Sequence, residues 1–564
     1  MLSDAGTRLS LVRGGPTVAI VALGLGLLTS PAARADVATQ LELRLGYEQA
    51  DPQAGDSETL IALRRFYANR GFQPLWVAAS GVTEAARTLA DVLARATEEG
   101  LDPADYRAGP IAERLSSEGD AELADLEYEL SRALVHYGTD LSAGRVDPAQ
   151  VDPEHHIEPE PIPAEKLLAG AKASGDLGAY LASLAPQSRE YRRLKSALAR
   201  YRELAAQGGW GTLAPGKTLK PGMREPRVTQ LRQRLIRSGD LAVTTAEPDL
   251  YDAPLEAAVR FFQRHHGLSV DGAVGQKTAA ALNVPVEARI EQMLLNMERR
   301  RWMPDHLGET YIFVNLADFV LKLVDGPKTI LDARVVVGKP YSRTPVFSAM
   351  MRYIVINPYW TIPSSIARKE ILPKLRRQPN YLAERNIRLF ADWTASAREV
   401  DASTIDWASV SPGQFNFKLR QEPGEGNALG RLKFMFPNRF NVYLHDTPQR
   451  DLFEQTVRSF SHGCIRVENP ARLAAVLLRD QPGWSEADIQ AAITTGEHRI
   501  VNLKTPVPVH LTYLTVWVNK DQSVHFRDDI YGRDERLKRA LRHSKTGNRT
   551  EPKRAPGRPA HSRE

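Results

Sequence analysis

The chain of 564 residues contains a single cysteine, Cys464, in the segment SHGCIR (461–466). One histidine, His445, precedes it by nineteen residues, and another, His462, lies two residues before it. A thiol becomes a strong nucleophile only when a base removes its proton, and a neighbouring histidine can take that proton and later give it to a leaving amine. These residue types predict a cysteine nucleophile whose base is either His445 or His462.

Spacing alone does not decide between the two histidines. His462 shares a face with Cys464 if this stretch is extended, whereas His445 needs the fold to bring it close. With either base, a thiolate paired with imidazolium would react well below the free thiol pKa of ~8.5. A zinc site from His445, His462, Cys464 and Asp446 is a weaker alternative, because structural zinc sites favour several cysteines in paired spacings.

The residues that flank the nucleophile suggest further roles. Gly463 permits close approach of the backbone, so the N–H groups of Gly463 and Cys464 could bind a developing oxyanion. Arg466 either binds a substrate carboxylate or pairs with Glu468, and the sequence leaves both open.

The N-terminus predicts export. Arg8 and Arg13 precede an apolar stretch over 17–28, and small residues end at Ala35, the arrangement of a secretory signal peptide over 1–35. The alternative is a membrane anchor, but the apolar stretch is shorter than the ~20 residues that a spanning helix needs. Export would leave Cys464 as a free thiol in an oxidising compartment, which makes it a candidate reactive group; the alternative is a small buried core residue.

The formal net charge of +6 comes from the two ends of the chain. Residues 531–564 hold 11 Lys and Arg against 4 Asp and Glu, and residues 1–35 hold three Arg against one Asp, so the middle is mildly acidic. This distribution argues against an extended nucleic-acid-binding face. The composition, 42% hydrophobic and 25% charged, is that of globular domains.

The first half of the chain predicts helices. Apolar residues spaced by three and four, as in 60–67, predict a helical scaffold domain over 36–207. A proline-rich loop interrupts it, and we expect its adjacent His155 and His156 to be solvated. A stretch rich in proline and glycine predicts a linker over 208–225.

Residues 226–285 predict a compact unit of three helices. Two helical stripes and a short third helix indicate it, and the stripes are Val228, Leu231 and Leu235, then Leu255, Val259 and Phe262. The segment VTQLRQRL, followed by AAVRFFQRHHGLSVDGAVGQKTAAALN, resembles the peptidoglycan-binding domain of cell-wall enzymes. This resemblance implies affinity for glycan or stem peptide rather than chemistry, and we place His265 and His266 at a helix end.

Strand signals begin after the three-helix unit. YIFVNL, FVLKLV and ARVVVG are rich in Val, Ile and aromatic residues, and predict a β-rich domain over 309–505. Residues 367–427 return to a helical and charged character, with KEILPKLRR and FNFKLRQ, and predict an insertion that caps a cleft. A C-terminal β-hairpin extension over 506–532 and a basic, disordered tail over 533–564 complete the expected domains.

The strongest resemblance lies around the nucleophile. SHGCIR, the upstream HDTP (445–448) and the preceding PGEGNALGRLKFMFPN are similar to the L,D-transpeptidase catalytic domain, in its large Gram-negative form with a helical scaffold and a capping insertion. NPYWTIP (357–363) and VVVGKPYSRTP (335–345) extend the similarity. The resemblance implies a multidomain α+β fold: a helical scaffold, a three-helix peptidoglycan-binding module and a β-rich catalytic domain with a capping insertion.

The same resemblance implies roles for individual residues. In that family the nucleophile is the cysteine of SHGC and the base is the upstream histidine, which correspond here to Cys464 and His445. Tyr443 and Arg466 are implied to lie near the substrate, and we also count His462 among the substrate-binding residues. The choice of His445 over His462 as the base therefore rests on the resemblance, not on spacing.

The implied function is peptidoglycan cross-linking in the periplasm. The enzyme would attack the carbonyl of the third residue of a tetrapeptide stem, expel the terminal D-alanine and hold an acyl-thioester on Cys464 until an acceptor amine resolves it. If that amine belongs to a neighbouring stem's diamino acid, the product joins two third residues, a step of cell-wall biogenesis that affects cell shape. This chemistry requires no metal or organic cofactor.

Two other functions remain open from the sequence. One is a cysteine L,D-carboxypeptidase or endopeptidase that cuts stems or releases wall-attached protein, and the other is a non-catalytic peptidoglycan-binding scaffold. The expected partners are stem peptides and glycan, with other cell-wall synthesis enzymes as candidates. We expect no nucleic acid and no stable membrane span after signal cleavage.

Overall fold

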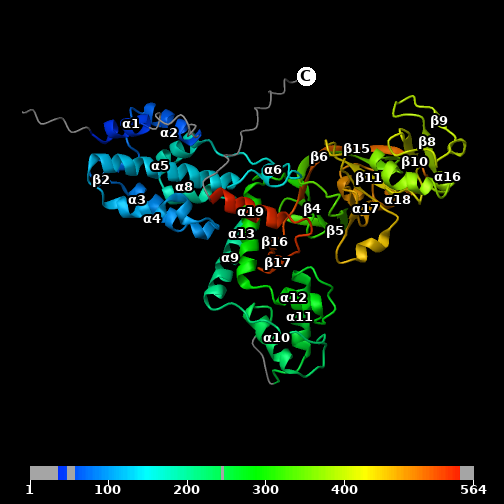
Figure 1. The fold of residues 1–564 in the computed structure, drawn as a ribbon, viewed down its shortest axis with the longest axis horizontal. Coiled ribbons are helices and arrows are strands. Elements are labelled where there is room, and N and C mark those ends of the chain that lie inside the picture. The colour runs from blue at the N-terminus through cyan, green and yellow to red at the C-terminus, as the bar shows by residue number, and fades with distance from the viewer. Residues whose placement is uncertain (1–35, 48–57, 243–246, 546–564) are drawn as a thin grey trace, which may run out of the picture.

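The computed structural model describes residues 36–47, 58–242 and 247–545 (Figure 1). The expected signal peptide, 1–35, lies outside the described residues. No helix in the described ranges is both long enough and apolar enough to cross a membrane. Figure 1 shows the N-terminal helices at one end of the molecule, strands β8 to β10 at the opposite end, and helices α10 to α12 projecting to one side.

The N-terminal domain is helical, as the apolar spacing predicts. Residues such as Leu63, Leu134 and Leu198 are fully buried in one shared core. A two-strand ribbon, β1 (Val77–Ala78) with β2 (Gly81–Val82), follows the second helix. The helices are α1 (Val37–Tyr47), α2 (Glu58–Ala68), α3 (Glu84–Ala94), α4 (Ala108–Glu113), α5 (Asp120–Ala143), α6 (Pro148–Val151), α7 (Ala164–Ala173), α8 (Leu177–Ser183) and α9 (Arg189–Ala206).

In the proline-rich loop after α6, His155 is buried rather than solvated, which corrects the expectation. His155 is 8% exposed, and its ring centre lies 5.0 Å from that of Trp302. The backbone N–H of His156 donates to the carbonyl of Val346 at 2.7 Å, and the Val346 N–H donates to the carbonyl of Glu154 at 2.8 Å. These two bonds join the loop to the β-rich domain, which buries His155.

The three-helix unit consists of α10 (Pro226–Arg237), α11 (Ala253–His265) and α12 (Gln276–Leu282). The preceding stretch, expected as a linker over 208–225, is partly packed against this unit, which corrects that expectation. Leu213 and Leu219 are buried in its core, and Leu219 exchanges backbone hydrogen bonds with Val274. Helix α13 (Val286–Arg301) then leads to the β-rich domain.

The β-rich domain is built on a nine-stranded sheet in the order β13-β5-β14-β12-β11-β6-β15-β3-β4. Because β4 also pairs with β5, the sheet curls back on itself. Helices α17 (Pro470–Leu477) and α18 (Glu486–Thr494) contribute to its core. The strands are β3 (Thr310–Asn315), β4 (Val320–Asp325), β5 (Lys328–Gly338), β6 (Phe347–Ile356), β11 (Leu432–Met435), β12 (Leu444–His445), β13 (Ser459–Ser461), β14 (Ile465–Val467) and β15 (Arg499–Thr512).

The expected boundary between residues 505 and 506 falls inside β15, whose C-terminal half pairs with β3 and β6. The hairpin itself is β16 (Val516–Val518) with β17 (Val524–Phe526). Its apolar residues Val516, Val518 and Phe526 belong to the core of the scaffold domain. The hairpin therefore ties the end of the chain to the N-terminal domain.

The insertion is only partly helical, which corrects the expectation for 367–427. Its first part contains α14 (Ser364–Ile366), a π-helical turn (Ala367–Ile371), α15 (Leu372–Leu375) and α16 (Tyr381–Glu384). The segment FNFKLRQ, expected as helix, ends in a strand whose residues are alternately half-buried and buried, the period of a β-strand. That strand joins a separate sheet in the order β7-β10-β8-β9, namely β7 (Trp360–Ile362), β10 (Lys418–Gln421), β8 (Ile387–Phe390) and β9 (Glu399–Val400).

The beginning of the expected disordered tail is a helix, α19 (Arg533–Lys545), which corrects that expectation. Leu537 and Leu541 lie four residues apart, on one face, and both are buried against Leu295 and Trp302. The first residue, Arg533, is 3% exposed. The high charge of this segment suggested a solvated tail, but Arg533 and Arg536 pair with Asp152 in a distant part of the chain.

Candidate active site

Two short parallel strands bring the predicted catalytic residues together. In the pairing of β12 with β14, Leu444 lies opposite Ile465 and His445 lies opposite Arg466. Leu444 and Ile465 are fully buried in the core, so their neighbours along each strand face the other side of the sheet. This register places Tyr443, His445, Cys464 and Arg466 on one face.

The thiol of Cys464 contacts the segment that leads into β12. Its Sγ lies 3.6 Å from the carbonyl oxygen of Asn441, to which the thiol donates. Burial raises the pKa of the Cys464 thiol above its ordinary value, and hydrogen bonds from Tyr443 and the charges of Lys433 and Arg466 only partly offset that effect. The resting thiol is therefore protonated at neutral pH.

His445 is 4% exposed, and its Nδ1 lies 2.5 Å from the carbonyl oxygen of Asp446. A carbonyl only accepts, so in the neutral ring Nδ1 carries the proton and Nε2 carries the lone pair that a base needs. Burial, followed by the positive charges of Arg466 and Lys433, lowers the pKa of His445 to about 3. Among the described residues no hydrogen bond joins His445 to Cys464 in this resting arrangement.

These electrostatics argue against a preformed thiolate and imidazolium pair. The raised pKa of Cys464 and the lowered pKa of His445 both favour the neutral forms. The charges that would compensate a thiolate at this site are the cations Lys433 and Arg466 rather than the imidazolium.

Lys433 is the residue of this site that sequence reasoning missed. It lies on β11 directly opposite His445, and its Nζ is 3.9 Å from the ring centre of Tyr443. Its neighbours Leu432 and Phe434 are fully buried. Their alternation in the sequence could have placed Lys433 on the face away from the core, but only the strand pairing shows that this face carries Cys464.

His462 points toward the insertion, not toward Cys464. Its Nε2 lies 2.5 Å from Oε1 of Glu370, in the π-helical turn of the insertion. The side chain of His462 remains 36% exposed. The second candidate base is thus occupied with a carboxylate of the insertion, and the structure keeps it apart from the face that holds His445.

Arg466 does not form the pair with Glu468 that the sequence left open. Glu468 instead binds Arg334 through contacts of 2.6 and 2.9 Å. Arg466 donates from Nη1 to Gln449 at 2.7 Å, and its Nε is buried without a partner among the described residues. The guanidinium therefore keeps a donor for a ligand that enters the site.

Gly463 has φ of +115°, a conformation that L side chains rarely adopt, which explains the glycine before the nucleophile. Its backbone N–H donates to Ser461 Oγ at 3.0 Å, so it is not free to bind an oxyanion, which corrects one of the two expected donors. The Cys464 N–H has no hydrogen-bond partner among the described residues. Of the expected pair, only the Cys464 N–H remains available.

The described residues contain no group of three or more His, Cys, Asp or Glu side chains arranged to hold a metal ion. Asp446, part of the zinc alternative, instead accepts the backbone N–H groups of Arg431 at 2.8 Å and Thr447 at 2.7 Å. It also pairs with Arg450 at 2.5 Å. Its carboxylate orders the turn after His445.

Three segments of the chain match known protein families. Residues 309–509 match the L,D-transpeptidase catalytic domain, YkuD. The chain carries an L,D-transpeptidase domain. Residues 224–282 match a peptidoglycan-binding domain, and residues 61–198 match a scaffold domain. All four residues of the shared face, and Lys433, lie within the L,D-transpeptidase domain.

Two curated proteins show sequence similarity to parts of the chain. A protein of Haemophilus influenzae named "Putative L,D-transpeptidase" is 36% identical over 253 residues, which cover 44% of this chain and 50% of that protein. The N-acetylmuramoyl-L-alanine amidase CwlM of Mycobacterium tuberculosis is 43% identical over 75 residues, 12% of this chain and 18% of that protein. The chain thus spans half or less of the length of these relatives.

Two solved structures described as L,D-transpeptidases align more distantly. One from Xylanimonas cellulosilytica is 15% identical with a TM-score of 0.18, covering 53% of this chain and 99% of its own. One from Stackebrandtia nassauensis is 13% identical with a TM-score of 0.20, covering 53% of this chain and 96% of its own.

Proposed function

We propose that the protein is a peptidoglycan L,D-transpeptidase that uses Cys464 as nucleophile and His445 as base. The observation that carries the proposal is the register of β12 and β14, which gives both residues one face of the L,D-transpeptidase domain. The Nε2 lone pair of His445 supports its role, because Nδ1–H is already bound to a carbonyl.

The proposed acylation begins with a tetrapeptide stem. As Cys464 attacks the carbonyl carbon of the third residue, its proton passes to His445, a C–S bond forms and the carbonyl π electrons move to oxygen. Collapse of this oxyanion restores the carbonyl and breaks the C–N bond to the terminal D-alanine. The departing nitrogen takes the proton from His445, which leaves an acyl-thioester and free D-alanine.

The acceptor reverses these movements. Its amine attacks the thioester carbon and gives a proton to His445, a C–N bond forms, and the C–S bond breaks to return the proton and electrons to Cys464. Water as the acceptor would give a hydrolysed tripeptide stem instead of a cross-link. The unpartnered Nε of Arg466 is the proposed contact for a substrate carboxylate.

The peptidoglycan-binding domain supports a substrate in the cell wall. The peptidoglycan-binding domain at 224–282 is proposed to retain the protein on glycan or stem peptides. A cell-wall enzyme family implies an extracytoplasmic location, and the periplasm is our specific proposal. Direct contact with other cell-wall synthesis enzymes remains a prediction.

Substitution of the nucleophile tests the proposal. Cys464→Ala should abolish the acyl-enzyme that wild type forms with a tetrapeptide stem, while the thermal unfolding midpoint changes little because one small atom is removed. Intact-protein mass spectrometry detects the adduct, and analysis of the released stems separates cross-linked from hydrolysed product. Turnover by Cys464→Ala equal to wild type would contradict the assignment, and hydrolysed stems alone would replace transfer with hydrolysis.

The base is tested by a matched pair of histidines. His445→Ala should lower the acylation rate by roughly 10²-fold or more, the usual scale for a general base. His462→Ala removes the contact with Glu370 and should change acylation much less. The reverse ranking in single-turnover acylation would exchange the two roles.

The proposed role of Lys433 has its own signature in the pH profile of thiol alkylation. Lys433→Met removes a cation that lowers the pKa of Cys464, so alkylation by iodoacetamide should require higher pH. Lys504→Met, which removes an exposed lysine of β15, is the control and should leave the profile unchanged. An unshifted profile in Lys433→Met would remove Lys433 from the site.

A further inference from the structure

Thr344 makes a direct contact with the backbone of the nucleophile segment. It lies in the loop between β5 and β6 and is fully buried. Its hydroxyl donates to the carbonyl oxygen of Gly463 at 2.8 Å and accepts the backbone N–H of Gly338 at 2.9 Å. Both hydrogen-bonding functions of the hydroxyl are therefore used by backbone groups.

The bonded carbonyl and the Cys464 N–H belong to one peptide unit. A trans peptide is planar, with its C=O and N–H pointing in opposite directions. Holding the Gly463 oxygen on Thr344 therefore fixes the direction of the Cys464 N–H, the remaining expected oxyanion donor. The freedom of a glycine at φ of +115° makes such an external hold necessary.

Thr344 is held in turn from two sides. Its N–H donates to the Tyr531 hydroxyl at 3.4 Å, and that hydroxyl donates to the Gly338 carbonyl at 2.6 Å. The Thr344 carbonyl accepts from Arg533 Nη2 at 3.3 Å. Gly338 has no room for a side chain, since an added Cβ would lie 2.2 Å from the carbonyl oxygen of Ser342.

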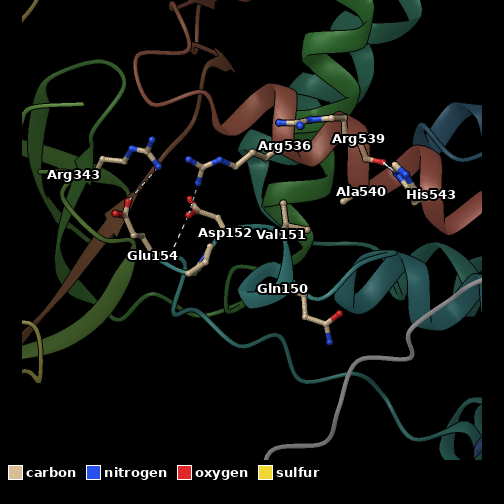
Figure 2. Close-up of a pocket in the computed structure, with 10 residues that line it drawn as sticks. Gln150, Val151, Asp152, Glu154, Arg343, Arg536, Arg539, Ala540 and His543 are labelled. Carbon is tan, nitrogen blue, oxygen red and sulfur yellow. Dashed lines mark hydrogen bonds and ion pairs between the residues drawn. The ribbon is translucent and has the colours of Figure 1, made fainter. Parts of the chain in front are cut away.

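Arg533 extends this hold to the scaffold domain. Its guanidinium contacts Asp152 at 2.5 Å and Glu154 at 3.2 Å in the loop after α6. Figure 2 shows these two acidic residues between Arg536 of α19 and Arg343 of the β5–β6 loop, beside a cavity of about 670 Å³. The contacts measure 3.1 Å for Asp152 with Arg536 and 4.0 Å for Glu154 with Arg343.

We propose that Thr344 is a positioning residue for acylation, which aims the Cys464 N–H at the oxyanion, and that Arg533 and Tyr531 hold Thr344 in place from the C-terminal segment. This inference rests on the proposed function, because it concerns the oxyanion of the acylation step. It assigns the C-terminal segment and the scaffold loop a part in the chemistry although neither touches the substrate.

Two reactions of the same thiol test the proposal. Acylation by a carbapenem forms a C–S bond to the lactam carbonyl through an oxyanion, breaks the ring C–N bond and leaves the proton on nitrogen. Alkylation by iodoacetamide displaces iodide and forms no oxyanion. Thr344→Val, similar in shape but without the hydroxyl, should slow acylation roughly 10- to 100-fold, below the 10²–10³ cost of removing an oxyanion donor. Alkylation and its pH profile should be unchanged.

Conservative variants complete the experiment. Thr344→Ser keeps the hydroxyl and should restore acylation to near the wild-type rate. Tyr531→Phe loosens Thr344 without touching Gly463, so acylation should fall a few-fold while alkylation is unchanged. If Thr344→Val does not fold, the positioning role of Thr344 is tested with Thr344→Ser and Tyr531→Phe instead.

The outcomes separate this inference from the proposed function. A wild type that is alkylated but never acylated, by the carbapenem or a tetrapeptide stem, would contradict the proposed function itself. If wild type is acylated, a parallel fall of acylation and alkylation in Thr344→Val would indicate only displacement of the thiol and would overturn the positioning role. Unchanged acylation in both Thr344→Val and Tyr531→Phe would overturn it as well.

Discussion

The segment that follows β15 is held against the rest of the chain at two places, built from different side chains. At the first, which we call the ionic junction, Arg533 contacts Asp152 and Glu154 and lies 4.9 Å from the ring centres of Tyr513 and Tyr531. Although burial raises the pKa of Asp152, Arg533, a backbone N–H and Arg536 lower it overall. The carboxylate of Asp152 therefore stays charged throughout the neutral range.

The second place, which we call the histidine junction, consists of His265, His266 and His525 with Trp517 and Phe526. The ring of His525 lies 4.4 Å from that of His265 and 5.0 Å from that of Trp517, and His266 stacks on Phe526 at 5.5 Å. It joins the end of α11 to the β16–β17 hairpin, so it connects the peptidoglycan-binding domain with the C-terminal segment.

The histidines of this junction are neutral in the folded protein. Burial lowers the pKa of His265 to about 4. Burial, followed by His265 and Arg527, lowers the pKa of His525 to about 3. A contact made from permanent charges is broken by removing a partner, whereas a contact made from neutral histidines is broken by acid. The two junctions should therefore fail under different conditions.

Substitution of Arg533 should have the largest effect. Arg533→Met leaves the buried carboxylate of Asp152 with Arg536, which is partly exposed, as its remaining cationic partner. The free energy of unfolding should therefore fall by about 3–5 kcal/mol, the scale for a broken buried pair. Urea unfolding at pH 7.5 and pH 5.5 should give similar losses. Arg536→Met, whose side chain is 28% exposed, is the control and should cost less than about 1 kcal/mol. Equal losses in the two variants would contradict the ionic junction.

Acidification should act on the histidine junction. Unfolded histidines titrate near pH 6.5, but the folded ones resist protonation, so stability is fully present above that pH and is lost as pH falls below it. The loss is about 1.4 kcal/mol per histidine for each pH unit below 6.5. Hydrogen-exchange protection, corrected for the intrinsic exchange rate at each pH, should fall more at pH 5.0 in α11 and β17 than at the start of α19, where His155 is a buried histidine nearby. An equal loss of protection in both places would contradict the proposed difference between the two junctions.

Replacement of one histidine should have the smallest effect and sharpen the comparison. His525→Phe keeps an aromatic ring against Trp517 but cannot take up a proton. The stability lost for each pH unit below 6.5 should therefore be smaller by about 1.4 kcal/mol than in wild type. Loss of the 2.7 Å contact with Asn519 should cost about 1 kcal/mol at pH 7.5. The exposed His306→Phe serves as the control. If His525→Phe loses as much stability on acidification as wild type, then His525 is not a source of the acid sensitivity.

The parts of the fold that the sequence predicted are those with local signals. The apolar spacing of the scaffold, the two apolar stripes of the three-helix unit and the segment SHGCIR each lie within a short stretch. Helix α19 had such a signal in Leu537 and Leu541, but its charges suggested a solvated tail. The partners that neutralise them, Asp152 and Glu291, lie hundreds of residues away.

The parts of the site that could not be predicted depend on pairing between distant strands. Lys433 enters the site because β11 pairs with β12, and no spacing along the chain shows that pairing. The Gly463 N–H was misassigned because its bond to Ser461 Oγ depends on the exact turn of the backbone. Glu370, which holds His462, lies 92 residues away in an insertion whose fold had been only partly predicted.

The contact between His462 and Glu370 has a consequence for how the insertion moves. Both side chains are more than a third exposed, so the pair contributes no more than about 1 kcal/mol, a roughly five-fold preference for the joined arrangement. Loop motions occur within nanoseconds to microseconds, whereas a typical turnover takes about 0.1 s. In the proposed reaction, we therefore expect this contact to open and reclose many times in each turnover. We expect it not to limit the rate at which a stem peptide enters or leaves.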